Sequence, residues 1–153
     1  QYGINSTALR LFNVYGPGQN MENLRQGMVS IFLAQAISDK HIHVKGSKDR
    51  YRDFVYIDDV VNAFIFTHNR RLTGFNTCNI STGVRTNVES LIDALVSNLP
   101  YEVSVEYKGG TPGDQYGITG SMEEAQRIIG WTPKFSLSEG LSKMVKWAQN
   151  SYQ

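Results

Sequence analysis

Short apolar runs typical of β-strands alternate with amphipathic helical patterns along most of this 153-residue chain. The strand-like runs lie at residues 7–12, 42–44, 52–57, 75–81 and 103–107. Apolar residues recur at helical spacing near residues 27–38, 61–68 and 88–99, and again toward the carboxyl end. Because helices cross between successive strands, the alternation predicts an α/β protein with parallel strand pairing.

Polar residues that commonly begin helices precede several of these patterns. Asp58 or Asp59 is placed to cap the helix that carries Val61, Phe64 and Ile65 on one face. We interpret this pair of aspartates as structural rather than catalytic. Capping boxes, in which Ser or Thr is followed three residues later by Glu, are predicted at Thr86–Glu89, Ser121–Glu124 and Ser136–Glu139.

Charge and cysteine content exclude several classes of protein. Fifteen basic and fourteen acidic residues give a net charge of +1, which argues against nucleic-acid or membrane-surface partners and favours a small or anionic metabolite. Cys78 is the only cysteine, and we interpret it as a small buried hydrophobe. No apolar run approaches the length of a membrane helix, so we expect a cytoplasmic protein without membrane contacts.

A strand followed by a tight turn lies near the start of the chain. Asn13 stands at the carboxyl end of the first strand, and Gly16-Pro17-Gly18 then turns the chain sharply. Ligands of open α/β sheets bind at this edge of the sheet. Four or five strands are too few for two mononucleotide-binding halves, so we expect an amino-terminal part of the fold to lie outside this chain.

Several segments resemble, in order, those of the NAD-dependent epimerase/dehydratase family, the extended short-chain dehydrogenases that act on nucleotide sugars. They are residues 9–18 (LRLFNVYGPG), 52–61 (RDFVYIDDVV), 79–83 (NISTG), 112–114 (PGD), 130–133 (GWTP) and 138–141 (SEGL). The resemblance implies that residues 1–153 are the carboxyl-terminal, nucleotide-sugar-binding part of an extended Rossmann-type epimerase. This part contains the last strands of the parallel sheet and a small α/β substrate-binding subdomain.

In that family the amino-terminal half carries a glycine-rich turn for NAD and a Tyr-x-x-x-Lys pair that transfers protons. None of the eight tyrosines here has a lysine four residues later, and no GxGxxG spacing occurs. We therefore assign no catalytic residue to this chain and expect NAD to be bound mainly by the absent half. The resemblance places only Phe12 beside the nicotinamide.

The resemblance also implies substrate contacts. Arg52 is expected to bind the nucleotide diphosphate, for which a guanidinium provides bidentate contacts, although a surface ion pair with a neighbouring aspartate is the alternative. Asn13 is expected to contact substrate, and a turn-forming asparagine is the alternative. Thr111 stands where many members carry a second diphosphate-binding arginine, which leaves Arg85 or Lys108 as substitutes.

Four further positions match the nucleotide-binding pattern of the family. Asp114 matches an aspartate that binds the ribose, with a loop-stabilising Asx turn as the alternative. Met28 and Val29 match the stretch whose backbone meets the nucleotide, although both could be core residues. Lys45 occupies the position beside the base where many members have an aromatic residue, so the sequence leaves the identity of the base open.

The sequence thus predicts the substrate-binding part of an NAD-dependent UDP-hexose 4-epimerase, which in full length transiently oxidises C4 and is a homodimer. The alternatives are part of a nucleotide-sugar 4,6-dehydratase and a non-catalytic nucleotide-sugar-binding module. The isolated piece is expected to be inactive. His41, His43 and His68 show no clustering with acidic or cysteine ligands along the sequence, so no metal site is predicted.

Overall fold

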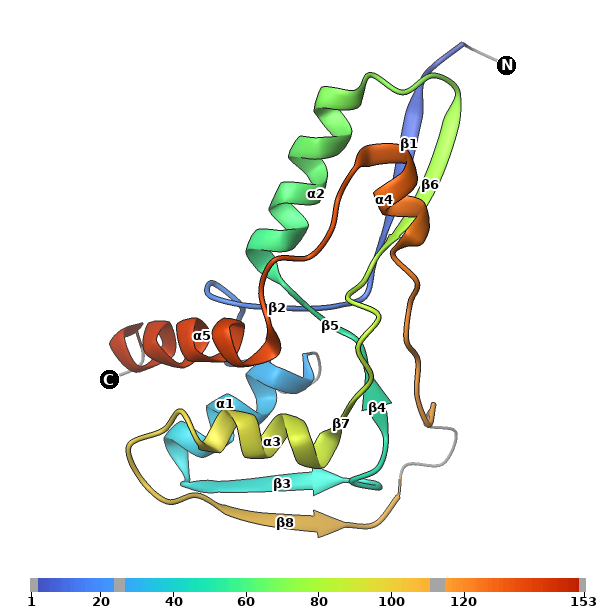
Figure 1. Ribbon diagram of the computed structural model, residues 1–153. Helices are drawn as coiled ribbons and strands as arrows, with labels where there is room; N and C mark the ends of the chain where they lie inside the picture. The colour runs from blue at the N-terminus through green and yellow to red at the C-terminus, as the bar shows by residue number, and fades with distance from the viewer. Residues whose placement is uncertain (1–2, 24–26, 111–114, 152–153) are drawn as a thin grey trace.

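The computed structural model describes residues 3–23, 27–110 and 115–151 (Figure 1). The strands are β1 (Ser6–Leu11), β2 (Asn13–Tyr15), β3 (His41–Lys45), β4 (Tyr51–Arg52), β5 (Phe54–Tyr56), β6 (Phe75–Ile80), β7 (Thr86–Asn87) and β8 (Ser104–Lys108). The helices are α1 (Met28–Ser38), α2 (Ile57–Arg70), α3 (Val88–Val96), α4 (Glu123–Ile129) and α5 (Leu137–Ser151).

The strands pair two by two. β1 pairs with β6, β2 with β5 and β3 with β8, all in parallel, whereas β4 and β7 are antiparallel. The predicted α/β class with parallel pairing is therefore confirmed. In Figure 1, β1, β6, α2 and α4 form one end of the molecule, α1, α3, β3 and β8 form the other, and β2 and β5 cross between them.

Each end has its own hydrophobic core. One core is built by α1, α3 and α5 over the inner face of β3, and its fully buried side chains include Leu33, Ile42, Leu91, Leu95 and Leu141. The other core lies between α2, α4 and β6, and it includes Val60, Ala63, Ile80, Ile129 and Trp131. The segment with β2 and β5 connects the two ends.

The strand predicted at residues 52–57 is divided at Asp53 into β4 and β5. The Asp53 side chain is fully buried, and its carboxylate accepts hydrogen bonds from the backbone N–H groups of Thr82, Gly83 and Gly120 at 2.8, 2.9 and 3.2 Å. The Thr82 hydroxyl donates a fourth at 2.6 Å. Asp53 therefore turns inward between β4, which pairs with β7, and β5, which pairs with β2.

The prediction that Asp58 or Asp59 caps α2 is wrong. The helix begins at Ile57, its N-cap is Tyr56, and both aspartates lie in the first turn. Asp59 is buried and accepts hydrogen bonds from the N–H groups of Lys134 and Phe135 at 2.9 and 3.1 Å. It therefore anchors the segment before α5, which is a structural role of a different kind.

Only one of the three predicted capping boxes forms. The Ser136 N–H donates to Glu139 Oε2 at 2.9 Å, and the Glu139 N–H donates back to Ser136 Oγ at 3.3 Å. Thr86 is instead paired in β7, so Asn87 caps α3 by accepting from the Ser90 N–H at 2.7 Å. At the third position α4 begins at Glu123 with Met122 as its N-cap, so Ser121 Oγ accepts from the Glu123 N–H at 3.2 Å, and Glu124 pairs with Arg127.

The apolar face predicted for α2 is exposed in the structure. Val61, Phe64 and Ile65 retain 49%, 56% and 50% of their accessible surface. The buried residues of α2 are Asp59, Val60 and Ala63, because α4 packs on the other side of the helix. Among the helices in the described ranges, none is both long enough and apolar enough to cross a membrane.

Candidate functional site

The chain changes strand partner at the end of β1. The Phe12 N–H donates to the Ile80 carbonyl beyond β1, and the Asn13 N–H donates to the Asp53 carbonyl at the start of β2, both at 3.1 Å. Phe12 and Asn13 therefore lie where the β1–β6 pair gives way to the β2–β5 pair. Such a change of direction at the carboxyl end of parallel strands opens space for a ligand.

A pocket of about 450 Å³ lies at this junction, and we call it the strand-switch pocket. It is lined by Phe12, Asn13, Val14, Gln19, Gly27, Met28, Val29 and Phe54. Its volume is within the range usual for small-molecule sites. Phe12, Asn13, Met28 and Val29 were all singled out from the sequence, and the structure brings the four together around this one cavity.

Asn13 is held firmly in the wall of the strand-switch pocket. Its side-chain Nδ2 donates to the Asp53 carbonyl at 3.1 Å, the same oxygen that its backbone N–H contacts. Because the amide nitrogen is engaged in this way, the amide oxygen is the group suited to accept a hydrogen bond from a ligand hydroxyl. Asp53 thus positions Asn13 from the junction of β4 and β5.

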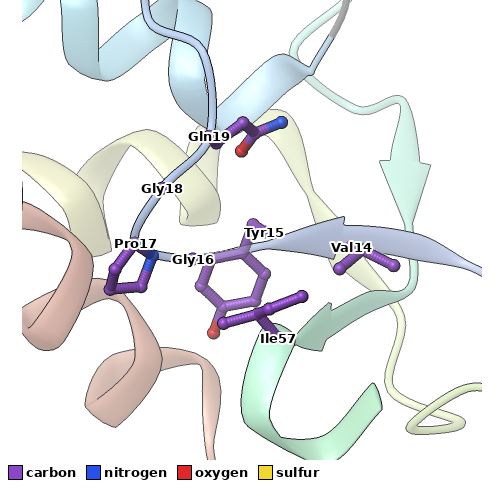
Figure 2. Close-up of a pocket in the computed structure, with 7 residues that line it drawn as sticks. All are labelled: Val14, Tyr15, Gly16, Pro17, Gly18, Gln19 and Ile57. Atoms are coloured by element: carbon purple, nitrogen blue, oxygen red, sulfur yellow. The ribbon is translucent and has the colours of Figure 1, made fainter. Parts of the chain in front are cut away.

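The turn after β2 borders a second cavity of about 290 Å³ (Figure 2). Val14, Tyr15, Gly16, Pro17, Gly18, Gln19 and Ile57 line it. At Gly16, where φ is 152°, an added Cβ would overlap the side chain of Ile57, so the turn requires glycine. The approach of α2 to this turn therefore depends on the Gly-Pro-Gly sequence.

Gln19 lines both cavities and was not predicted from the sequence. Its Oε1 is buried and accepts no hydrogen bond from the described residues. An unsatisfied buried polar atom costs about 1–3 kcal/mol, which favours a ligand or water that can donate to it. Only the tertiary structure reveals this feature, since a glutamine after a turn carries no distinctive sequence signal.

Tyr15, next to the turn, has a structural role. Its hydroxyl donates to the Leu137 carbonyl at 3.2 Å. The pKa of Tyr15 is raised far above its ordinary value, mainly because the phenol is buried. The neighbouring Tyr56 and the negative charges of Asp59 and Glu139 raise it further. This phenol stays protonated, unlike a tyrosinate that acts as a base.

Arg52 lies in β4, opposite Thr86 of β7, and does not line the strand-switch pocket. Its Nη1 donates to the Tyr51 carbonyl at 2.8 Å. Burial lowers the pKa of Arg50, and the nearby positive charge of Arg52 lowers it further. The guanidinium of Arg85 lies 3.7 Å from the centre of the Tyr51 ring. Three arginines therefore gather around Tyr51, a composition suited to an anion.

Arg85 also borders a third cavity, which has a volume of about 360 Å³. Its other lining residues are Asp49, Asn87, Ser90 and Tyr116. Lys108, the other substitute suggested for a second diphosphate arginine, instead forms an ion pair with Glu106 at 2.9 Å. Of the two, Arg85 is the one that lies beside β4, over the ring of Tyr51.

The remaining substrate-binding residues expected from the sequence lie elsewhere. Lys45 is exposed at the end of β3, and its carbonyl accepts a hydrogen bond from Arg50. It is not among the residues that line the strand-switch pocket. Asp114 lies outside the described residues.

Asp53 was also missed as an organising residue. It holds the loop at Thr82 and Gly83 with its side chain and holds Asn13 with its carbonyl. The sequence does contain a signal for it, because a charged residue within the apolar run 52–57 is expected to be buried with several hydrogen-bond partners.

Comparison with known proteins identifies relatives of this chain. The profile of the NAD dependent epimerase/dehydratase family matches residues 1–81. UDP-glucose 4-epimerase of Mycolicibacterium smegmatis is 28% identical over 152 residues, which are 99% of this chain and 48% of that protein. The chain therefore spans about half the length of such curated relatives.

Solved structures show the same half-length correspondence. UDP-glucose 4-epimerase of Thermotoga maritima with UDP-glucose superposes with a TM-score of 0.92 at 33% identity, over 100% of this chain and 48% of that one. MoeE5 in complex with UDP-glucuronic acid and NAD superposes with a TM-score of 0.85 at 28% identity, over 95% and 47%. Both matches extend over both ends of the molecule and the strands between them.

Proposed function

Because the chain belongs to the NAD-dependent epimerase/dehydratase family, we propose that it forms the nucleotide-sugar-binding part of a UDP-hexose 4-epimerase. The observation that carries this proposal is the convergence of Phe12, Asn13, Met28 and Val29 on the strand-switch pocket. Structures similar to this chain were solved with UDP-glucose and with UDP-glucuronic acid and NAD, which supports a UDP-sugar as ligand.

Arg52 and Arg85 are the groups we assign to the diphosphate. Planar guanidinium groups make paired hydrogen bonds to phosphate oxygens, and Arg85 is already oriented by its contact with the Tyr51 ring. We assign Asn13 to a sugar hydroxyl, from which its amide oxygen can accept a hydrogen bond. Arg52 precedes Asp53, whose carbonyl holds Asn13, and groups held in place in this way lose less entropy on binding.

The described residues fit NAD only at the nicotinamide end. The Phe12 ring is close to Ser81 and Gly120, since a Cβ added to Gly120 would lie 2.6 Å from Phe12 Cζ and 2.5 Å from Ser81 Oγ. The Ser81 hydroxyl is buried and has no hydrogen-bond partner among the described residues. Phe12 would contribute an apolar wall beside the nicotinamide of NAD, which would supply reversible hydride transfer at C4 of the sugar.

We further propose that an amino-terminal NAD-binding part completes the fold in a cytoplasmic homodimer. A parallel sheet is normally covered on both faces, yet β1 and β6 form a sheet of only two strands here. Val61, Phe64 and Ile65 present an exposed apolar surface on α2 beside it. Without that part, the chain lacks a proton-transferring tyrosine–lysine pair and is expected to be inactive.

Calorimetric titration with UDP tests the binding site. Arg52→Ala is expected to weaken UDP binding about 10- to 100-fold, because a charge-assisted hydrogen bond contributes about 1.5–3 kcal/mol. Arg52→Lys should recover only part of the loss, since an ammonium cannot make the paired contact. The control is Arg127→Ala, which removes an exposed arginine on α4. Equal affinity of wild type and Arg52→Ala would contradict the assignment.

The reaction itself is tested with the complete protein, UDP-glucose and NAD. A 4-epimerase yields the C4 epimer, whereas a 4,6-dehydratase yields a 4-keto-6-deoxy sugar, and the two products are distinguished by NMR. A complete protein that binds UDP-sugars but turns over neither would favour the non-catalytic binding module.

A further inference from the structure

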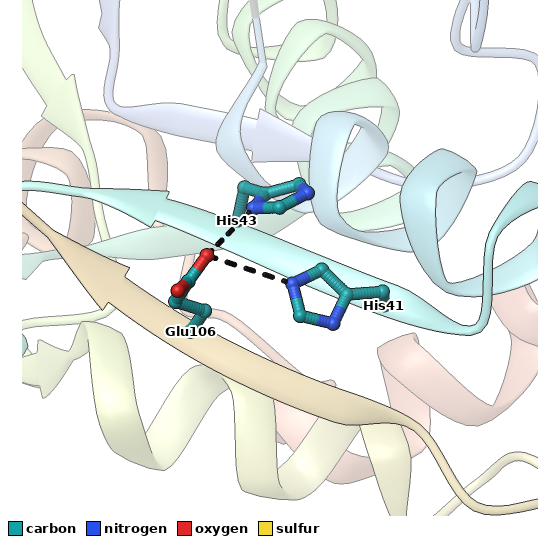
Figure 3. A group of neighbouring side chains, drawn as sticks. All are labelled: His41, His43 and Glu106. Atoms are coloured by element: carbon teal, nitrogen blue, oxygen red, sulfur yellow. Dashed lines mark ion pairs between the residues drawn. The ribbon is translucent and has the colours of Figure 1, made fainter.

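Two histidines and a glutamate meet on the outer face of the β3–β8 sheet (Figure 3). His41 and His43 are two residues apart in β3, so both point away from the core, toward which Ile42 is directed. The parallel register places Glu106 of β8 opposite His43. The expectation that these histidines do not cluster with an acidic ligand is therefore wrong, because β8 follows β3 by about sixty residues and only strand pairing joins them.

The three side chains are already close to the spacing of ligands around one ion. His43 Nδ1 lies 3.3 Å and His41 Nε2 lies 3.9 Å from the same oxygen, Glu106 Oε2. One ligand atom from each residue lies within 4.8 Å of the other two. With bonds of about 2.0–2.2 Å, tetrahedral Zn²⁺ ligands are roughly 3.3 Å apart, so small side-chain rotations complete the geometry.

The hydrogen bonds around His41 favour the tautomer that binds metal. The Ser104 hydroxyl donates to the Lys40 carbonyl at 3.3 Å, so its oxygen accepts from His41 Nδ1–H at 2.5 Å. In neutral His41 the lone pair is then on Nε2, the nitrogen that faces Glu106 Oε2. This nitrogen and the carboxylate oxygen are both acceptors, so they repel each other unless a cation or proton lies between them. The hydrogen bond from Nδ1–H to Ser104 is also typical of a metal-binding histidine, whose second nitrogen normally donates to an acceptor.

Glu106 is ionised under ordinary conditions. Its other oxygen, Oε1, accepts from Lys108 Nζ at 2.9 Å, and this hydrogen bond is the main reason that the pKa of Glu106 is lowered. Oε2 remains directed at the histidines. The positive charge of Lys108 at the same time opposes a second cation, so its removal should strengthen metal binding.

We propose that His41, His43 and Glu106 form a binding site for a divalent transition-metal ion such as Zn²⁺, with water as the fourth ligand. Two imidazoles and one carboxylate are a donor set that zinc accepts. An ion held in this way would link β3 to β8 across the edge of the substrate-binding end. The proposal does not depend on UDP binding, because none of the three residues lines the strand-switch pocket.

Calorimetric titration of untagged protein with Zn²⁺ near pH 7.5 tests the proposal. We expect one ion per chain, an affinity at least tenfold lower in His43→Gln and in Glu106→Gln, and a higher affinity in Lys108→Gln. The control is His68→Gln, since His68 is the third histidine of the chain and is exposed on α2. Circular dichroism establishes that each variant is folded.

Titration with Co²⁺ provides an independent measure, because four-coordinate Co²⁺ absorbs strongly in the visible range and hexaaqua Co²⁺ does not. Wild type and His68→Gln should develop this absorption, and His43→Gln should not. The proposal is overturned if wild type binds no ion, if His43→Gln binds as tightly as wild type, or if His68→Gln weakens binding equally.

Discussion

Replacement of Asp53 by asparagine should destabilise the protein strongly, although the two side chains have nearly the same shape. The Asp53 carboxylate is fully buried and accepts four hydrogen bonds, two on each oxygen. An asparagine keeps one oxygen and turns an NH₂ group toward the donors on the other side. About two buried donors then lose their acceptor.

The magnitude follows from those lost contacts. Each buried donor without an acceptor costs about 1–3 kcal/mol, so for two donors the free energy of unfolding should fall by about 2–6 kcal/mol. This is a large share of the roughly 5–15 kcal/mol typical of a folded domain. UDP affinity should fall as well, because the Asp53 backbone holds Asn13.

Urea unfolding followed by tryptophan fluorescence measures the effect, since Trp131 is buried in the core beside α2. The matched control is Asp49→Asn, which removes the same charge at an exposed position nearby and should change stability by no more than about 0.5 kcal/mol. If Asp53→Asn and Asp49→Asn had equal effects, the role given to the buried carboxylate would be refuted.

Two further predictions concern the turn and the β3–β8 surface. Gly16→Ala should lower the free energy of unfolding by about 1–3 kcal/mol, because the new methyl group overlaps the side chain of Ile57. Adding Ile57→Ala to the same chain should recover part of this loss. If thermal unfolding shows that the two substitutions destabilise additively, the proposed clash is contradicted. Lys108→Gln should raise the pKa of Glu106 toward its ordinary 4.5. Since the folded pKa is lowered, any stability from Glu106 is present above about pH 4.5 and is lost as the pH falls through the folded value. NMR titration of the Glu106 carboxyl measures the pKa in wild type and in Lys108→Gln, and urea unfolding at several pH values measures the change in stability. An unchanged pKa in Lys108→Gln would exclude the hydrogen bond as the cause of the lowered value.

The local sequence was sufficient for the element types and for much of the pocket. The helix predicted at residues 27–38 corresponds to α1, and the capping box at Ser136 and Glu139 forms. Asn13 was placed at a ligand-binding strand end by strand and turn rules, whereas the role of Phe12 rested on the family resemblance. Periodicity, capping and turn chemistry are local properties, so they can be recognised before the chain is folded.

Contacts between distant segments could be decided only by the tertiary structure. The sequence predicted Thr86 as a helix cap, but Thr86 pairs with Arg52 and is part of a strand. The apolar stripe at Val61 and Phe64 was clear from its spacing, yet which face of α2 meets α4 depends on how the two helices pack. The register of β3 and β8 likewise brings His43 to Glu106.

Sequence alone therefore determined the α/β class, the family resemblance and the residues at the strand end, because each rests on short patterns in neighbouring residues. The tertiary structure decided that Asp53 is buried, that Gln19 keeps an unsatisfied oxygen between two cavities, and that two histidines share a carboxylate. Burial and hydrogen-bond satisfaction depend on atoms contributed by segments far apart in the chain. Their arrangement exists only once the strands have paired and the helices have packed.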